Sequence, residues 1–225
     1  MASQYDKNYT EYGYSMHYKK SSSAHVFNDT VLQFYVELME IKPVVWRRIQ
    51  VPFHYNFWDL HTAVQDAMGW WDSHLHNFSI RGKRKRKKAL IGIPDFHKTG
   101  DLPEVFPGWE IPVTVHFNSP GVEAVYEYDY GDGWMHMVKL EGHIHREIKL
   151  KYPLCIAGER ACPPEDCGGV YGYYDLLKVL SDPKHADYHD TRTWVGEDYD
   201  PEYFDHEKVK FDDPYKRWTG AFLER

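Results

Sequence analysis

The chain has 225 residues, of which 42% are hydrophobic and 16% aromatic, enough apolar side chains for one substantial core. Its formal charge of −7 argues against a protein built wholly around nucleic acid, although it leaves room for a local basic patch. Three cysteines cannot all pair, no apolar leader follows Met1, and no apolar run approaches the roughly 20 residues of a membrane helix. We therefore expect a cytoplasmic protein without a membrane segment.

The chain begins with a polar stretch that gives way to strands. Residues 1–29 have no hydrophobic period and predict a flexible N-terminal extension. Residues 31–38 alternate between apolar and polar side chains, the period of a half-buried strand, and residues 44–51 predict a second strand. The folded domain is therefore expected to span residues 30–212, with a C-terminal tail at residues 213–225.

The clearest helix pattern covers residues 56–69. Asn56 is a good N-cap with Asp59 three residues later, which is close to a capping box. Apolar side chains then recur at helical spacing, and Gly69 provides the stop. This segment predicts an amphipathic helix that packs on the sheet.

Two further strand regions are expected to carry polar side chains. Period two over residues 74–80 places His74 and His76 on one face, and residues 113–117 suggest another strand. Residues 124–140 predict a hairpin that turns at Gly131-Asp132-Gly133. A two-residue turn would place Asp129 opposite His136, and a three-residue turn would place Tyr128 there.

The segment at residues 152–174 holds all three cysteines together with a Pro-Pro and a Gly-Gly step, and it predicts a rigid, irregular loop. Short helices are expected after it, at residues 173–180, 185–195 and about 201–209. The pattern predicts an α+β fold, with a largely antiparallel sheet covered by helices and a C-terminal third that is mainly helical.

Five segments stand out along the chain. They are IKPVVWRRIQVP from Ile41, FWDLHTAVQDAMGWWDSHLHNF from Phe57, YEYDYGDGWMH from Tyr126, YPLCIAGERACPPEDCGGVYGY from Tyr152 and DYDPEYFD from Asp198. In this order they closely resemble the plasmid pRiA4b Orf-3-like family, also labelled as insertion-element passenger (TnpR-like) proteins. The resemblance covers residues 31–211. It implies a single α+β domain, a link to plasmids or mobile elements, and no settled biochemical activity.

The cysteines suggest a zinc site as one hypothesis. Cys155, Cys162 and Cys167 could hold Zn²⁺ with a histidine brought in by folding, because thiolate and imidazole suit this ion. Their spacings of six and four intervening residues match no standard zinc finger. The alternative is that the thiols are small buried hydrophobes that fill a tight loop.

A second hypothesis concerns polar side chains at the strand ends, which could bind a metal or act as general acid and base. They could equally cap turns or be satisfied by backbone groups. The candidate catalytic residues are Asp72, His74, His76, Asp129, Asp132 and His136.

A basic run suggests a contact with nucleic acid, since clustered cations attract phosphates without reading sequence. The alternative is a solvated loop between two strands. The run contains Lys83, Arg84, Lys85, Arg86, Lys87 and Lys88.

Our leading interpretation is a non-catalytic binding or interaction module, with the cysteine segment packed against the His74/His76 strand and the hairpin. The alternative is a metal-dependent hydrolase that acts on nucleic acid. The two differ in whether the polar side chains must converge in an open cleft.

Overall fold

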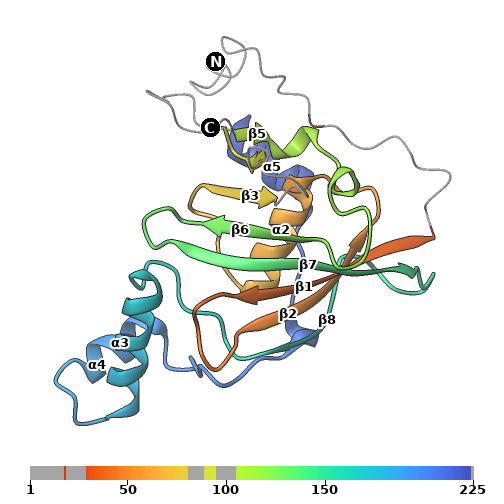
Figure 1. Ribbon diagram of the computed structural model, residues 1–225. Coiled ribbons are helices and arrows are strands. Elements are labelled where there is room, and N and C mark those ends of the chain that lie inside the picture. Colours follow the sequence, from red (N-terminus) through yellow and green to blue (C-terminus); the bar gives the residue numbers. More distant parts are fainter. Residues whose placement is uncertain (1–17, 19–28, 81–88, 95–104, 224–225) are drawn as a thin grey trace.

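The computed structural model describes residues 18, 29–80, 89–94 and 105–223, and its centre is one eight-stranded sheet (Figure 1). The strand order is β5-β4-β3-β6-β7-β1-β2-β8, and every neighbouring pair is antiparallel except β4 and β5. The strands are β1 (Thr30–Leu38), β2 (Trp46–Pro52), β3 (His76–Ile80), β4 (Ala89–Gly92), β5 (Val105–Pro107), β6 (Glu123–Tyr128), β7 (Trp134–His145) and β8 (Leu154–Glu159). The predicted α+β class with a largely antiparallel sheet is confirmed.

Helix α2 (Phe57–Met68) packs on the sheet and completes the core, as its place against β6 and β7 in Figure 1 indicates. Its start has the full capping box that the sequence predicts: the Asn56 side chain accepts from Asp59 N, and the Asp59 side chain accepts from Asn56 N. Gly69 ends the helix in the left-handed region at φ 89°. Almost every α2 side chain is buried, because the sheet covers one side and α5 contacts another.

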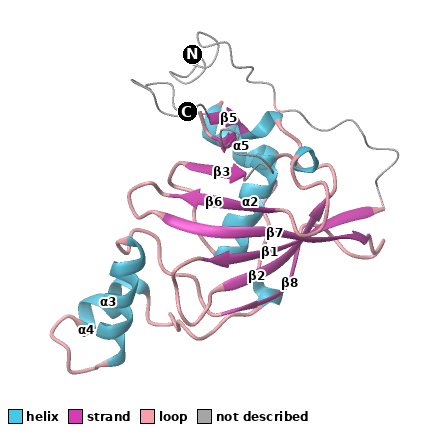
Figure 2. Cartoon of the chain, in the orientation of Figure 1, coloured by secondary structure: helices cyan, strands magenta, loops and turns pink. Residues whose placement is uncertain are grey.

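Three further α-helices follow the sheet (Figure 2): α3 (Gly169–Ser181), α4 (Tyr188–Val195) and α5 (Pro214–Phe222). Helices α3 and α4 pack on each other at one end of the sheet, whereas α5 packs against α2. Short 3-10 helices occur at Gly108–Glu110, Val113–Val115 and His206–Lys208. No helix of the described chain is long and apolar enough to cross a membrane.

Helix α5 lies in the region that the sequence predicted to be a tail. Asp213 caps it by accepting from Tyr215 N and Lys216 N, and Pro214 occupies the first helical position. Trp218 and Phe222, four residues apart, enter a second aromatic cluster with Trp58 of α2 and Trp109. The C-terminal residues to 223 are therefore part of the folded domain.

Other expectations of local structure are wrong. Residues 113–117 contain a 3-10 turn instead of a strand, and residues 201–209 contain only a turn and the 3-10 helix at His206–Lys208. Extended chain and β8 occupy much of the last third, so its mainly helical character is not confirmed. The DYDPEYFD stretch has no apolar stripe at helical spacing, so a helix there would lack the packing that stabilises short helices.

The hairpin and the cysteine segment also differ from expectation. The turn spans residues 129–133, and His136 pairs with Tyr126, so neither predicted register is correct. Asp129, at φ 55°, and Gly133, at φ 69°, provide the backbone of this longer turn. The cysteine segment begins as strand β8, which includes Cys155, and becomes irregular only after Glu159.

The basic run, Lys83 to Lys88, and most of the N-terminal extension lie outside the described residues.

Candidate functional site

Three of the segments that stand out in the sequence meet at one end of the sheet. They contribute residues 70–76, which join α2 to β3, residues 128–133 of the hairpin turn, and residues 162–169 of the cysteine segment. We call this meeting point the loop junction. The contact of the cysteine segment with the hairpin and with the start of the β3 region agrees with the packing expected from the sequence.

Hydrogen bonds fasten the cysteine segment to the other two loops. Trp70 Nε1 donates to the Pro163 carbonyl at 2.9 Å, and Trp71 N donates to Glu165 Oε2 at 3.0 Å. The Tyr128 hydroxyl donates to the other oxygen of the Glu165 carboxylate. Glu165 therefore links both neighbouring loops, and burial together with this bond raises the pKa of Tyr128 well above its usual value.

A second set of contacts surrounds His74. Its Nε2 atom lies 3.0 Å from Asp166 Oδ1 and 3.6 Å from Asp129 Oδ2. Asp132 accepts a hydrogen bond at 3.1 Å from Gly168 N, at the entry to α3. Both Asp129 and Asp166 have positive φ, a conformation that aspartate tolerates better than most residues. These strained loops are held by the contacts between them.

A groove of about 330 Å³ opens on the surface of the loop junction. Its lining includes Trp70, Pro163 and Glu165, together with Trp71 and Trp194, which are 84% and 53% exposed. The Asp166 side chain, 72% exposed, also lines it. Two exposed indole rings therefore share one groove with two carboxylates, a grouping more informative than a single exposed aromatic ring.

The negative charge of the protein is concentrated in the segment that supplies much of this groove, including Glu165 and Asp166. Residues 159–205 contain 12 Asp and Glu but only 4 Lys and Arg, whereas the other 178 residues contain 22 and 23. The segment therefore has a formal charge of −8 and the rest of the chain +1. A field of this sign attracts cations and repels phosphates at the loop junction.

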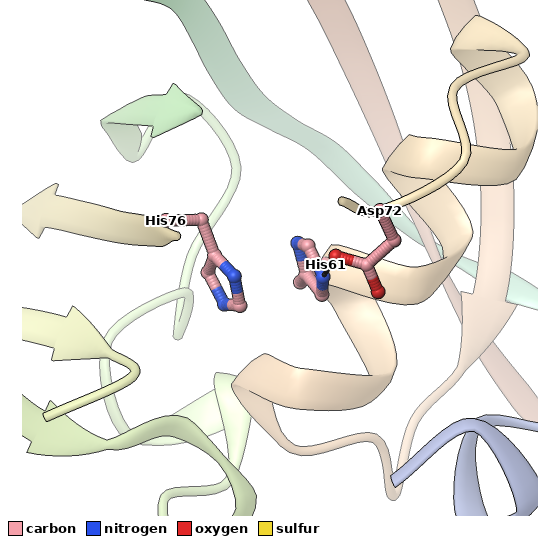
Figure 3. A group of neighbouring side chains, drawn as sticks. All are labelled: His61, Asp72 and His76. Atoms are coloured by element: carbon pink, nitrogen blue, oxygen red, sulfur yellow. Dashed lines mark hydrogen bonds and ion pairs between the residues drawn. The ribbon is translucent and has the colours of Figure 1, made fainter. Parts of the chain in front are cut away.

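A buried polar cluster lies beneath the junction, formed by His61, Asp72 and His76 (Figure 3). His61 comes from α2, Asp72 from the following loop and His76 from the first position of β3. The two imidazole rings are stacked, with centroids 3.4 Å apart and an interplanar angle of 9°. Asp72 adopts φ 61°, which directs its carboxylate back toward the helix, as Figure 3 shows.

A hydrogen-bond chain runs through the core from this cluster. Gln65 Nε2 donates to the Tyr126 hydroxyl at 2.8 Å. The same hydroxyl oxygen lies 2.7 Å from His61 Nδ1. His61 Nε2 lies 2.8 Å from Asp72 Oδ1. Burial keeps His61 neutral, with its pKa well below the usual range, so Nδ1 accepts from Tyr126 and Nε2 donates to Asp72. Burial raises the pKa of Asp72 to about 6, against the opposing effect of His76 and Arg217.

His76 is the anomaly of the cluster. It is fully buried, and neither of its ring nitrogens has a hydrogen-bond partner among the described residues. Burial lowers its pKa well below the usual range, so the ring is neutral. A buried polar group without a partner costs about 1–3 kcal/mol, which is why such groups are rare in native proteins.

The six candidate catalytic residues are distributed over distinct places. Asp72 and His76 join His61 in the buried cluster, and His74 and Asp129 join Asp166 at the surface. Asp132 fixes the start of α3. His136 is fully buried on β7, where its ring contacts Trp70 and Tyr126. His74 and His76 do not share an environment, because β3 begins only at His76.

Within the described ranges, the cysteines do not gather with other ligands around a common point. Among the described residues, neither group of side chains that could hold a metal ion includes a cysteine. Cys155 Sγ contacts the Ala157 carbonyl, and Cys162 is almost fully buried. Burial raises the pKa of Cys167 to about 12 and that of Cys162 further, so both are thiols and not thiolates in this arrangement.

Sequence reasoning missed His61, Glu165, Asp166 and Trp194. His61 lies within the apolar stripe of α2, between Leu60 and Val64, and a polar residue on a buried face is the signal that could have revealed it. Glu165 and Asp166 were noted only as part of the cysteine segment. Trp194 reaches the groove only through the packing of α4.

The fold and these contacts define a single α+β domain in which connecting loops assemble a surface groove above a buried histidine cluster. The chain belongs to the plasmid pRiA4b ORF-3-like protein family, whose model matches residues 30–208. This confirms the family that the sequence resembles.

Two relatives support this assignment. The uncharacterized protein y4hQ of Sinorhizobium fredii is 34% identical over 173 residues, which cover 76% of this chain and 84% of that protein. The crystal structure of MM3350 from Methanosarcina mazei Go1, a protein of unknown function, aligns with a TM-score of 0.72 and 39% identity. That alignment covers 81% of this chain and 99% of the other.

Proposed function

We propose that the protein is a non-catalytic binding domain whose groove at the loop junction takes a cationic side chain from a basic segment of a partner protein. The observation that carries the proposal is the pairing of two exposed indoles, Trp71 and Trp194, with the carboxylates of Glu165 and Asp166 in one groove. A cation over an indole face is attracted by the ring quadrupole, and a neighbouring carboxylate adds a charge-assisted hydrogen bond.

The electrostatics favour this occupant over nucleic acid at the same site. The surrounding segment has a formal charge of −8, so a phosphate backbone would be repelled there. Arginine suits the site better than lysine, because its planar guanidinium can stack on an indole while it pairs with a carboxylate. The link to plasmids or mobile elements rests on the family resemblance alone.

The hydrolase alternative has weaker geometric support. A metal-activated water needs an open position that a substrate can reach, and His61 and His76 are both fully buried. In the group around His74, Asp129 is itself buried and accepts from Gly131 N within the hairpin turn.

The proposal is tested by calorimetric titration with hexa-arginine as the probe, using hexaglutamate as the charge control. Trp71→Ala combined with Trp194→Ala should weaken hexa-arginine binding about tenfold or more, since each exposed cation–π contact contributes about 0.5–1 kcal/mol and more when desolvated. Tyr171→Ala is the matched control, because Tyr171 is 88% exposed on neighbouring α3 but does not line the groove. Equal loss in all variants would contradict a specific site and indicate general charge attraction.

A further inference from the structure

The buried cluster of His61, Asp72 and His76 contains the donor types of a metal site. One ligand atom from each side chain lies within 4.8 Å of the other two. Two imidazoles and one carboxylate are a donor set that suits borderline divalent ions such as Zn²⁺ and Co²⁺. The three ligands come from α2, from the loop after it and from β3, so an ion bound here would tie the helix to the sheet.

We propose that His61, Asp72 and His76 bind one divalent transition-metal ion of the zinc class, in a structural site distinct from the cysteines. The independent observation is His76, a fully buried imidazole with no hydrogen-bond partner in the described part of the chain. Figure 3 shows its ring beside that of His61, and one of its ring nitrogens lies within 4.8 Å of the ligand atoms of His61 and Asp72. An ion removes this unsatisfied group without any change in the fold.

Binding of an ion requires one of the two histidine rings to move. A metal lies about 2.0–2.1 Å from an imidazole nitrogen and close to the plane of its ring. The planes of His61 and His76 are nearly parallel and stacked 3.4 Å apart, so one ring must tilt for both to reach the same ion. His76 is the ring that tilts, because this breaks no hydrogen bond among the described residues.

The surroundings of His61 suit a metal ligand. When its Nε2 atom binds a metal, Nδ1 carries the proton and donates to the Tyr126 hydroxyl, 2.7 Å away. Tyr126 then needs an acceptor for its own proton, and Gln65 Oε1 is buried without a partner in the described chain. A flip of the Gln65 amide supplies that acceptor. Such outer partners commonly orient histidine ligands.

The two oxygens of the Asp72 carboxylate face different partners. Its Oδ1 atom faces His61, whereas its Oδ2 atom lies 3.8 Å from Arg217 Nη1. Arg217 opposes a nearby cation, but its charge is shared with Asp66 at 2.6 Å and Asp212 at 2.5 Å. The carboxylates around the guanidinium therefore compensate the added positive charge of the ion.

The test uses the full chain, stripped with a chelator and titrated with Zn²⁺ by calorimetry and with Co²⁺ by visible absorption. We expect one ion per chain, a raised thermal midpoint, and a Co²⁺ spectrum of nitrogen and oxygen ligands with no thiolate charge-transfer band. His76→Phe, which matches the aromatic surroundings, should weaken Zn²⁺ binding by more than about 100-fold. Tyr126→Phe should weaken it about 10- to 100-fold, the usual effect of losing an outer partner.

Two variants separate this site from its competitors. Cys162→Ser and His74→Ala should bind Zn²⁺ with unchanged affinity, because neither side chain belongs to the cluster. The proposal is overturned if the wild-type chain binds no Zn²⁺, if a thiolate band appears with Co²⁺, or if folded His76→Phe keeps full affinity. Circular dichroism confirms folding, and the Co²⁺ spectrum of the wild type decides the ligand type even if a variant unfolds.

Discussion

Single residues in the core show how far burial shifts the chemistry of this protein. His136 is fully buried between Trp70 and Tyr126, and burial lowers its pKa to about 3. In the unfolded chain the same group titrates near its ordinary value of about 6.5. Between these two pKa values His136 is protonated in the unfolded state but not in the folded state. Lowering the pH through this range therefore favours unfolding.

The expected loss of stability at acid pH can be tested by chemical denaturation at several pH values. Between pH 6.5 and pH 5, the unfolding free energy of the wild type should fall as the pH is lowered. Because of His136 it should fall by up to about 1.4 kcal/mol per pH unit more than in a variant that lacks this histidine. His136→Phe should therefore show a shallower pH dependence, and His136→Leu serves if the larger ring is not accommodated. Parallel curves for wild type and variant would contradict the assignment.

The sequence did not reveal which side chains at the loop junction contact each other. For example, it contained Glu165 within a recognisable segment but did not show that Glu165 bonds to Trp71 N and Tyr128. Asp72 and Asp129, expected together in one catalytic group, belong to different clusters: Asp72 lies with His61 and His76, and Asp129 with His74 and Asp166.

Among the elements, α3 is placed by an unusually close contact with the hairpin turn. Gly169 adopts φ 67°, and a Cβ atom there would lie 2.4 Å from the Asp132 carbonyl oxygen. Gly169→Ala should lower the free energy of unfolding by about 2–4 kcal/mol, because backbone strain and steric overlap add together.

A matched glycine isolates the steric part of this effect. Gly69 has a similar φ of 89°, but a Cβ atom there would meet nothing within 4 Å. Gly69→Ala should therefore show only the cost of the left-handed conformation, about 1–2 kcal/mol. Equal losses in the two variants, measured by urea denaturation, would show that the contact with Asp132 is unimportant.

Helix α5 makes a prediction about the boundary of the domain. Trp218 is 2% exposed and packs with Trp109 and Phe222. Trp218→Ala should cost about 3–5 kcal/mol, as large-to-small changes in a core do. Trp194→Ala, at a ring 53% exposed, should stay within about 0.5 kcal/mol of the wild type in the same thermal and urea denaturation. A loss of less than about 1 kcal/mol in Trp218→Ala would contradict the inclusion of α5 in the folded domain.

The elements that the sequence predicted well are those with local signals. Helix α2 has a capping box, an apolar stripe and a glycine stop, and β1 and β2 have clear alternation. Helix α5 was missed because its two buried aromatic residues pack against Trp58, which is far away in the sequence. Trp58 also donates from Nε1 to the Pro214 carbonyl, 156 residues further along the chain. The hairpin register failed because five residues form the turn.

At the scale of the whole molecule, charge and architecture separate two regions. The sheet and α2 form the core, and the acidic segment, residues 159–205, contains α3 and α4, which lie at one end of the sheet. The overall charge of −7 concealed this division, since it lies almost wholly in residues 159–205. Sequence alone predicted the α+β class and the family, but only the fold brought Trp71, Trp194 and the two carboxylates into one groove.

The groove and the buried cluster are adjacent but have different tests. Binding in the groove depends on exposed charge and should weaken as salt is added, because exposed charges are screened beyond about 10 Å at 0.1 M. A buried metal ion is shielded from such screening. The two proposals can therefore fail independently.

The most direct measurement of the central claim is a titration of the ¹⁵N-labelled protein with hexa-arginine, followed through the indole N–H signals of its eight tryptophans. We predict that the signals of Trp71 and Trp194 shift in a saturable manner, while those of buried Trp109 and Trp218 stay in place. Shifts that do not saturate, or that leave Trp71 and Trp194 unaffected, would contradict a cation-binding groove at the loop junction.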